Sequence, residues 1–387
     1  MKKFGLIPWL ILALIVGTLI GLYAPGWAIR LTETGRILLG NVIKYFIPLI
    51  MIFFVAAGIA EFGEDSSKIL GVTVGISYVS TIIASVLGAV AAFGLVPAFG
   101  IKGGEMVAAV SIGGPFVEIN MPPIMDIMSA LLFAFIFGVG ITWTKNETLK
   151  KALVGGRDII ALMIKRVITP LIPFFIAFVF AGLAAKGQVF ATASVFAKML
   201  ILIVLLQFVW LAIQYGVAGA YSKTNPFKAF KVMIPAYLTA MGTMSSAATM
   251  PVSLEQGRKI PGMKKEIADF VMPLCSTVHL SGAAMTITIS AITVNFLTTG
   301  TLPPIGTLAS FIILLGVIEV GAVGVPGGSI MAALGILSTS LGFGEEALAL
   351  MMTIFMIQDS FGTATNIVGD GAIAMIINKK YGKDIAA

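Results

Sequence analysis

The polar residues best suited to chemistry in this chain lie in one segment near its C-terminal end. Asp359, Asn366 and Asp370 occur between Leu348 and Asn378, where almost every other side chain is apolar or small. With Thr363 they are spaced i, i+4, i+7 and i+11, which places them along one stripe of a helix. An ionisable group at bilayer depth costs about 2.5 to 3.5 kcal/mol on insertion and persists mainly where it faces a partner, an ion or a substrate. The stripe therefore predicts a transporter-like binding site.

The composition predicts an all-α integral membrane protein. Of 387 residues, 58% are hydrophobic and only 11% are charged, and the mean hydropathy is +1.04. Soluble proteins are about a quarter charged. A membrane β-barrel would need short alternating segments, whereas these apolar runs are long and unbroken. The formal net charge is +7, but Lys and Arg lie largely in the connections, so we expect them to set orientation and expect no nucleic-acid partner.

Six apolar runs of spanning length come first. They cover residues 6–23, 37–60, 69–98, 127–143, 159–184 and 195–220. We interpret the first, preceded by Lys2 and Lys3, as a retained helix and not as a cleaved signal peptide. The single cysteine, Cys275, excludes an internal disulfide bond and is interpreted as a packing residue.

The pattern then changes to interrupted segments. Polar and helix-breaking residues interrupt residues 232–254 and 305–341: Thr243, Ser245, Ser246, Thr249 and Pro251 in the first, and Gly321, Gly324, Pro326, Gly327, Gly328 and Ser329 in the second. A segment carrying polar groups follows each, at residues 270–294 and 348–378. Irregular backbone is tolerated at membrane depth only where it is buried in protein or lines a cavity. Paired interruptions of this kind are the best sequence indication of a transporter's central site.

The basic residues give the expected topology. Clusters around Lys2, Lys150, Lys228, Lys264 and Lys380 fall on one side only if both interrupted segments return to the side from which they came. The positive-inside rule makes that side the cytoplasm. We therefore predict eight transmembrane helices and two inverted re-entrant helical hairpins in the cytoplasmic (inner) membrane, with both termini cytoplasmic.

Four short elements, in this order, resemble the dicarboxylate/amino acid:cation symporter family, the glutamate-transporter homologues. They are SSAATMP at 245–251, the break in helix 7 from Pro273 to Ala283, GVPG at 324–327, and helix 8 from Asp359 through NIVGD at 366–370. The resemblance implies a homotrimer with an elevator motion. It implies scaffold helices 1 and 2 in residues 1–68 and helices 4 and 5 in 101–188. The transport domain would comprise helix 3 in 69–100 and helix 6, both hairpins, helix 7 and helix 8 in 189–387.

The resemblance also implies a substrate site between the hairpin tips. Half-helix N-termini present free N–H groups and a positive dipole end, which suit a substrate carboxylate. We place that group at Ser245 and Ser246 of the first tip and at Gly324, Val325, Gly327 and Ser329 of the second. Asp359 falls where the family binds the substrate ammonium, and Thr363 and Asn366 add polar contacts on the same face. The alternative is that these Ser and Gly residues only pack helices.

Two departures from the family pattern predict a small neutral amino acid as the substrate. Members that carry acidic substrates place an Arg where this chain has Gly362, and some keep a compensating Arg where it has Met244. Without that cation, a second substrate carboxylate would be buried unpaired, which costs a large free energy.

The cation sites differ from the family's as well. Asn366 and Asp370 remain and offer oxygens for one Na⁺, and Thr277 is kept. His279, Leu280 and Ser281 replace the family's Asn, Met and Asp in helix 7. His279 titrates near neutral pH and can carry a proton, and Glu319 interrupts an apolar run near the second tip. We therefore expect coupling to H⁺, to Na⁺ or to both, although His279 can also be a satisfied core residue and Glu319 a water-facing or salt-bridged one.

Other functions stay open at this point. One alternative is an Na⁺-coupled symporter of serine-, threonine- or alanine-like or acidic amino acids. Another is an ion channel, since re-entrant loops also build selectivity filters. An enzyme has little support, because no nucleophile, acid and base form a recognisable constellation, and we expect no cofactor.

Overall fold

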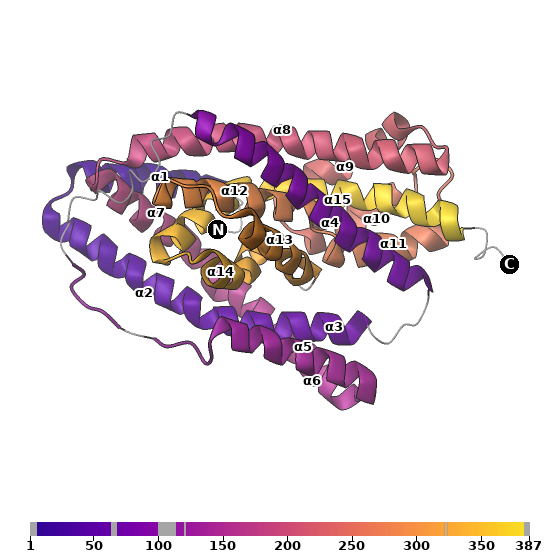
Figure 1. Cartoon of the computed structure of the whole chain (residues 1–387), viewed down its shortest axis with the longest axis horizontal. Helices are drawn as coiled ribbons and strands as arrows, with labels where there is room; N and C mark the ends of the chain where they lie inside the picture. Colours follow the sequence, from indigo (N-terminus) through magenta and orange to yellow (C-terminus); the bar gives the residue numbers. More distant parts are fainter. Residues whose placement is uncertain are drawn as a thin grey trace.

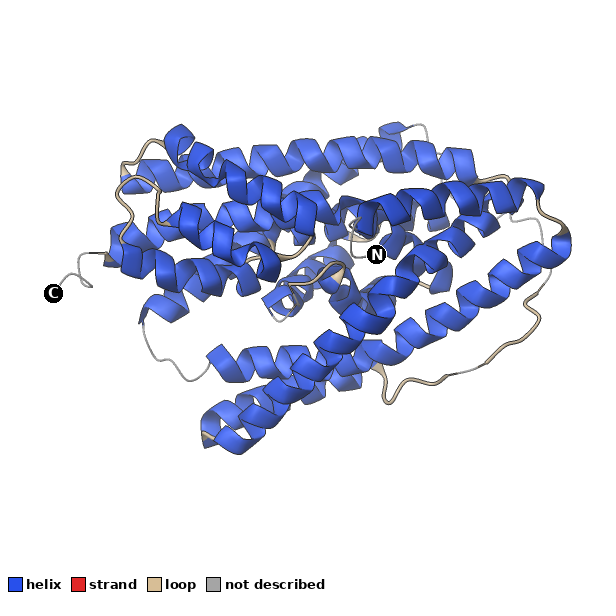
Figure 2. Cartoon of the chain, turned by 180° about the vertical axis from the view of Figure 1, so that it is seen from behind, coloured by secondary structure: helices blue, strands red, loops and turns tan. Residues whose placement is uncertain are grey.

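The computed structural model describes residues 6–62, 68–99, 114–119, 121–320, 322 and 324–382. All regular secondary structure in these ranges is helical, as Figure 2 shows. The predicted all-α class is therefore confirmed. The predictions that involve Lys2, Lys3 and Gly321 lie outside the described residues.

The helices follow one another with few long connections. They are α1 (Leu6–Tyr23), α2 (Gly26–Ile50), the π-helical turn η1 (Met51–Val55), α3 (Ala56–Phe62), α4 (Lys68–Leu95), the 3₁₀ turn η2 (Pro97–Phe99), α5 (Ile127–Thr144), α6 (Glu147–Met163), the π-helical turn η4 (Ile164–Ile168), α7 (Thr169–Ala185), α8 (Val189–Ser222), α9 (Pro226–Thr243), α10 (Ser246–Gly257), α11 (Lys265–Val278), α12 (Ser281–Thr299), α13 (Ile305–Val320), α14 (Gly328–Leu341) and α15 (Glu345–Tyr381).

Within the described ranges, six continuous helical stretches are long and apolar enough to cross a membrane. One of them, Gly26–Ala60, begins eleven residues before the run predicted to start at residue 37. The added turns carry Glu33 and Arg36, which form an ion pair at 2.6 Å across one helical turn. Such i, i+3 pairing lets a polar stretch continue a helix, and hydropathy alone does not detect it.

The two predicted interruptions are present. The first hairpin breaks between α9 and α10, where Met244 adopts a left-handed conformation (φ +52°) and Ser245 caps α10 by accepting a hydrogen bond from the Ala248 N–H at 3.3 Å. The second breaks between α13 and α14, and Gly327 supplies a left-handed turn (φ +74°) just before α14. In each hairpin the two helices contact each other.

Helix 7 is also interrupted where the resemblance implied. α11 ends at Val278, His279 is extended, and α12 begins at Ser281. The break leaves the N-terminal amide groups of α12 without partners in their own helix. They must find acceptors elsewhere in the protein.

The polar helix α15 lies in the interior. Figure 1 shows α8 along one long side and α2, α3, α5 and α6 along the other, with the helices of the C-terminal third between them. α15 contacts α8, α9, α11 and α12. In the most apolar 18-residue part of α15, 89% of the residues are buried, whereas only 39% are buried in the corresponding parts of α4 and α8. The stripe of polar residues on α15 therefore faces protein along its length.

Candidate functional site

The two hairpin tips touch each other. The Ser245 hydroxyl donates a hydrogen bond of 2.6 Å to the Gly324 carbonyl, and the Ala247 N–H approaches the same oxygen at 3.4 Å. A Cβ atom added to Gly324 would lie 3.2 Å from the Ala247 nitrogen and 3.3 Å from the Ser246 Cβ. Glycine at this position therefore permits the close approach of the tips. Ser246, the first residue of α10, is buried beside this contact.

Asp359 lies under the second tip. Its Oδ2 accepts a hydrogen bond of 2.7 Å from the Gly327 N–H, and its Oδ1 accepts one of 3.2 Å from the Thr363 hydroxyl. The side chain is buried, and the tip amide it binds directly precedes α14. The positive end of a helix dipole favours a negative group in this position. The structure thus joins Asp359, Thr363 and Gly327, three of the predicted substrate-binding residues.

Asn366 provides the acceptor that the broken helix lacks. Its Oδ1 accepts hydrogen bonds from the N–H groups of Gly282 at 2.7 Å and Ala283 at 3.4 Å, so it caps α12 from a neighbouring helix. A Cβ added to Gly282 would lie 2.6 Å from the Gly362 carbonyl oxygen, which shows how closely α12 and α15 approach. Ser281 is buried at the start of α12, and its hydroxyl has no hydrogen-bond partner among the described residues.

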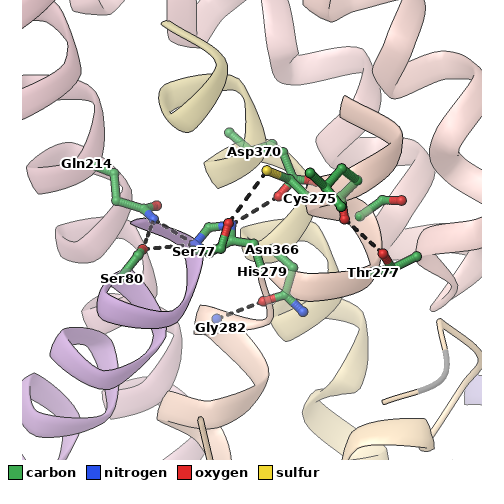
Figure 3. A network of polar contacts seen from close by, with 12 residues as sticks. Ser77, Ser80, Gln214, Cys275, Thr277, His279, Gly282, Asn366 and Asp370 are labelled. Carbon is green, nitrogen blue, oxygen red and sulfur yellow. Dashed lines mark hydrogen bonds and ion pairs between the residues drawn. The ribbon is translucent and has the colours of Figure 1, made fainter. Parts of the chain in front are cut away.

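His279 and Asp370 form a fully buried pair. The Nδ1 of His279 lies 3.0 Å from Oδ1 of Asp370, and neither side chain is exposed. On the other side of the ring, Nε2 lies 2.9 Å from the Ser80 hydroxyl and 3.2 Å from Nε2 of Gln214. Figure 3 shows these four residues, which α4, α8, the helix 7 break and α15 bring together.

These contacts define how hydrogen bonds run through the pair. The Gln214 amide nitrogen is only a donor and also donates to Ser80 at 2.9 Å. The Nε2 of His279 therefore acts as an acceptor, which leaves the proton of a neutral ring on Nδ1, where it is donated to Asp370. Oδ2 of Asp370 and Oε1 of Gln214 have no partner among the described residues. The pair thus keeps one unpaired carboxylate oxygen that a proton or a cation can bind.

Glu319 is enclosed within the second hairpin. Its side chain is fully buried, Oε2 accepts a hydrogen bond of 2.8 Å from the Ser329 hydroxyl, and Oε1 has no partner in the described structure. Neither alternative considered from the sequence, a water-facing residue or a salt-bridged one, describes this position. Ser329, which we predict to bind the substrate carboxylate, contacts Glu319 through its hydroxyl in this structure.

Two predicted residues lie outside these contacts. Thr277 is exposed, and its hydroxyl donates a hydrogen bond of 2.8 Å to the Leu274 carbonyl of its own helix and not to Asp370. Val325 is half-buried in the second tip and offers no side-chain hydrogen bond.

Sequence reasoning missed Ser80 and Gln214. Both lie in runs that we interpreted only as apolar spans. Gln214 could have been identified from the sequence, because an amide side chain inside a membrane-spanning helix must find hydrogen-bond partners in the protein. Gln207, one heptad earlier on α8, behaves in the same way and donates to Thr286 of α12 at 3.0 Å.

Comparison with known proteins gives matches along nearly the whole chain. Residues 6–380 match the sodium:dicarboxylate symporter family. The serine/threonine transporter SstT of Acinetobacter baylyi is 25% identical over 395 residues, covering 97% of this chain and 98% of that protein. SstT of Bifidobacterium adolescentis is 28% identical over 390 residues, covering 95% and 87%. Human excitatory amino acid transporter 2 is 30% identical over 156 residues, which cover 40% of this chain and 27% of that protein.

Proposed function

Because the chain belongs to the sodium:dicarboxylate symporter family, we propose that it is a secondary active transporter that carries a small neutral amino acid across the cytoplasmic membrane together with H⁺, Na⁺ or both. Membership makes it a multi-pass protein of a transporter family with cation-coupled relatives. We infer the substrate and the coupling ion from the residues of the candidate site.

One observation carries the proposal: a buried carboxylate lies directly beneath two joined helix tips. Asp359 offers the negative charge that a substrate ammonium needs, and the positive dipole ends of α10 and α14, which meet where the tips join, suit a carboxylate. A zwitterion satisfies both groups at once, whereas a bare ion satisfies only one. This arrangement favours an amino acid carrier over an ion channel.

The surroundings of Asp359 support a neutral side chain on the substrate. A Cβ added to Gly362 would lie 3.6 Å from the Ala283 nitrogen, so this position faces the backbone of α12. Met244, at the first tip, is buried and apolar. Neither residue supplies the cation that a second carboxylate requires. Two relatives that match almost the whole chain are named serine/threonine transporters, which supports the same substrate class. Acidic substrates remain the alternative outcome.

The architecture we propose follows the sequence-based topology. Adding α1 and α5 to the six long stretches gives eight spans, and the pairs α9–α10 and α13–α14 serve as inverted re-entrant hairpins. Residues 1–68 and 101–188 form the scaffold of a homotrimer, and 69–100 and 189–387 form a transport domain that moves as an elevator. Both termini lie in the cytoplasm, and the partners of the trimer are the amino acid substrate, the coupling ion and the lipid bilayer.

Coupling is assigned to two separate groups. His279 contacts Asp370 where the family's pattern has a neutral helix 7 ligand, so in its protonated form the ring replaces a metal cation as the partner of this carboxylate. Glu319, whose partner is the neutral Ser329 hydroxyl, is the second candidate for proton binding. Na⁺ at the oxygens of Asn366 and Asp370 is the competing assignment.

Uptake into proteoliposomes tests the substrate. We expect saturable counterflow of labelled serine, threonine or alanine, with aspartate and glutamate as weak competitors. A panel in which aspartate exchanges as well as serine would contradict the neutral assignment, and non-saturable flux of the ion alone would favour a channel.

The coupling ion requires imposed gradients. In sodium-free buffer we expect a pH gradient to drive uptake in the wild type, and expect His279→Asn and Glu319→Gln each to lower this response at least about tenfold while amino acid binding persists, because each removes one titrating group. The matched control is Thr293→Val, a buried change on α12 whose hydroxyl bonds only within its own helix. Strict sodium dependence with no effect of either substitution would establish the Na⁺ alternative.

A further inference from the structure

A crevice of about 510 Å³ lies between α4, α8 and the C-terminal half of α15. Its walls run from Val72 to Ile83 on α4, from Trp210 to Val217 on α8, and from Ala372 to Ile376 on α15. The lining is apolar except for Ser80, Gln214 and the indole N–H of Trp210. No residue of the proposed substrate site lines it.

The crevice opens on the exposed side of α4 and α8, which the proposed topology places in the bilayer. α4 and α8 are the least buried of the long helical stretches, and Val79 and Val217 on its walls are 53% and 58% exposed. The wall on α4 spans eleven helical steps, about 16 Å, which is roughly half of the 30 Å hydrocarbon core. Its length therefore matches the acyl layer of one leaflet.

Three lysines lie just beyond one end of the crevice. α4 begins at Lys68, about 6 Å beyond Val72 along the helix, and α15 carries Lys380 about 6 Å beyond Ile376. Lys223 follows the last turn of α8, about 9 Å beyond Val217. These three lysines are exposed and form no ion pair with a carboxylate in the described ranges. Basic residues at the edge of a membrane span attract anionic lipid headgroups.

The floor of the crevice touches the His279 pair. Ser80 and Gln214 line the crevice and also contact Nε2 of His279 at 2.9 and 3.2 Å. Nε1 of Trp210 and Oε1 of Gln214 have no hydrogen-bond partner among the described residues. An occupant of the crevice would thus contact the side chains that hold His279 against Asp370.

We propose that this crevice binds an anionic phospholipid of the cytoplasmic leaflet, with one acyl chain between α4 and α8 and the headgroup on the lysines at its mouth. The proposal rests on the orientation assumed under the proposed function, but not on the substrate or the coupling ion. A bound chain stabilises the contacts of Ser80 and Gln214 with His279, so the lipid acts on transport from outside the substrate site.

Two glycines of α4 provide a matched test. Gly75 lines the crevice and Gly71 does not, yet an added Cβ meets no atom within 4 Å at either position. Gly75→Leu therefore places a side chain in the crevice from a position where its Cβ meets no other atom, and Gly71→Leu controls for the change in helix propensity. Purified protein in detergent is titrated with phosphatidylglycerol or phosphatidylcholine, and bound lipid is counted by native mass spectrometry. We expect Gly75→Leu to weaken phosphatidylglycerol binding about tenfold, since about two methylenes lose their site, and Gly71→Leu to bind as the wild type does.

The headgroup is tested separately. Lys68→Gln together with Lys380→Gln should weaken phosphatidylglycerol binding about twenty-fivefold, from about fivefold per lysine, and leave phosphatidylcholine binding unchanged. Equal affinity of the wild type for the two lipids, or wild-type binding by Gly75→Leu, would overturn the proposal. Because bound lipid is measured without transport, a failure of the proposed function would not alter this result.

Discussion

Replacing Asp359 by Asn separates the charge of this residue from its structural contact. The side-chain oxygen of the introduced asparagine can still accept the hydrogen bond that Gly327 N–H donates to Asp359 at 2.7 Å, so the second hairpin keeps its tip contact. The substrate ammonium loses its buried carboxylate partner beneath the tips. Removing one partner of a buried charge pair costs about 3 to 5 kcal/mol, so Asp359→Asn should weaken amino acid binding by roughly a hundredfold or more.

Thr363→Val gives the matched comparison. It removes only the hydroxyl that donates to Asp359 at 3.2 Å, a neutral donor to a charged acceptor. The expected cost is about 1.5 kcal/mol, roughly tenfold in affinity. Calorimetric titration of purified protein in nanodiscs measures both variants, and thermal unfolding reports whether each is folded. Binding by Asp359→Asn within threefold of the wild type, or a larger loss in Thr363→Val, would refute the ammonium assignment.

Three further changes test the packing around the site and the ion pairs that join α15 to its neighbours. Gly324→Ala places a Cβ 3.2 Å from the Ala247 nitrogen, so the tips should separate and substrate affinity should fall about threefold to tenfold, an effect of about 1 kcal/mol; unchanged affinity would show that the tips need not touch. Gly282→Ala places a Cβ 2.6 Å from the Gly362 carbonyl oxygen and should destabilise the protein by about 1 to 3 kcal/mol in chemical unfolding, while Gly306→Ala, which meets open space, should not. Glu345 pairs with Lys44 of α2, and Glu346 pairs with Lys186, which follows α7. If the transport domain moves as an elevator, these ion pairs must break, so replacing both glutamates by Gln should speed amino acid exchange up to about fivefold, from about 1 kcal/mol of ion pairing. A slower exchange would show that these ion pairs do not restrain the motion.

The sequence by itself determined the class and the order of the elements. Long apolar runs with few charges permit only helices in a membrane, and the interruptions near Ser245 and Gly327 end helices because capping residues and glycines favour turns. The break after Val278 was predicted only through the family resemblance, because no capping residue or glycine marks it. Polar residues on one helix, such as Asp359 and Asp370, share a face because the helical repeat fixes their directions.

Only the tertiary structure decided what each polar residue contacts. The stripe on α15 serves three different partners: Asp359 binds the second tip, Asn366 caps α12, and Asp370 meets His279. Ser80 and Gln214 come from runs whose protein-facing and lipid-facing sides are both apolar. Their hydropathy therefore gives no period from which the rotation of α4 or α8 can be inferred. Burial in a membrane protein does not sort polar from apolar faces as water does, so packing between helices alone set these contacts.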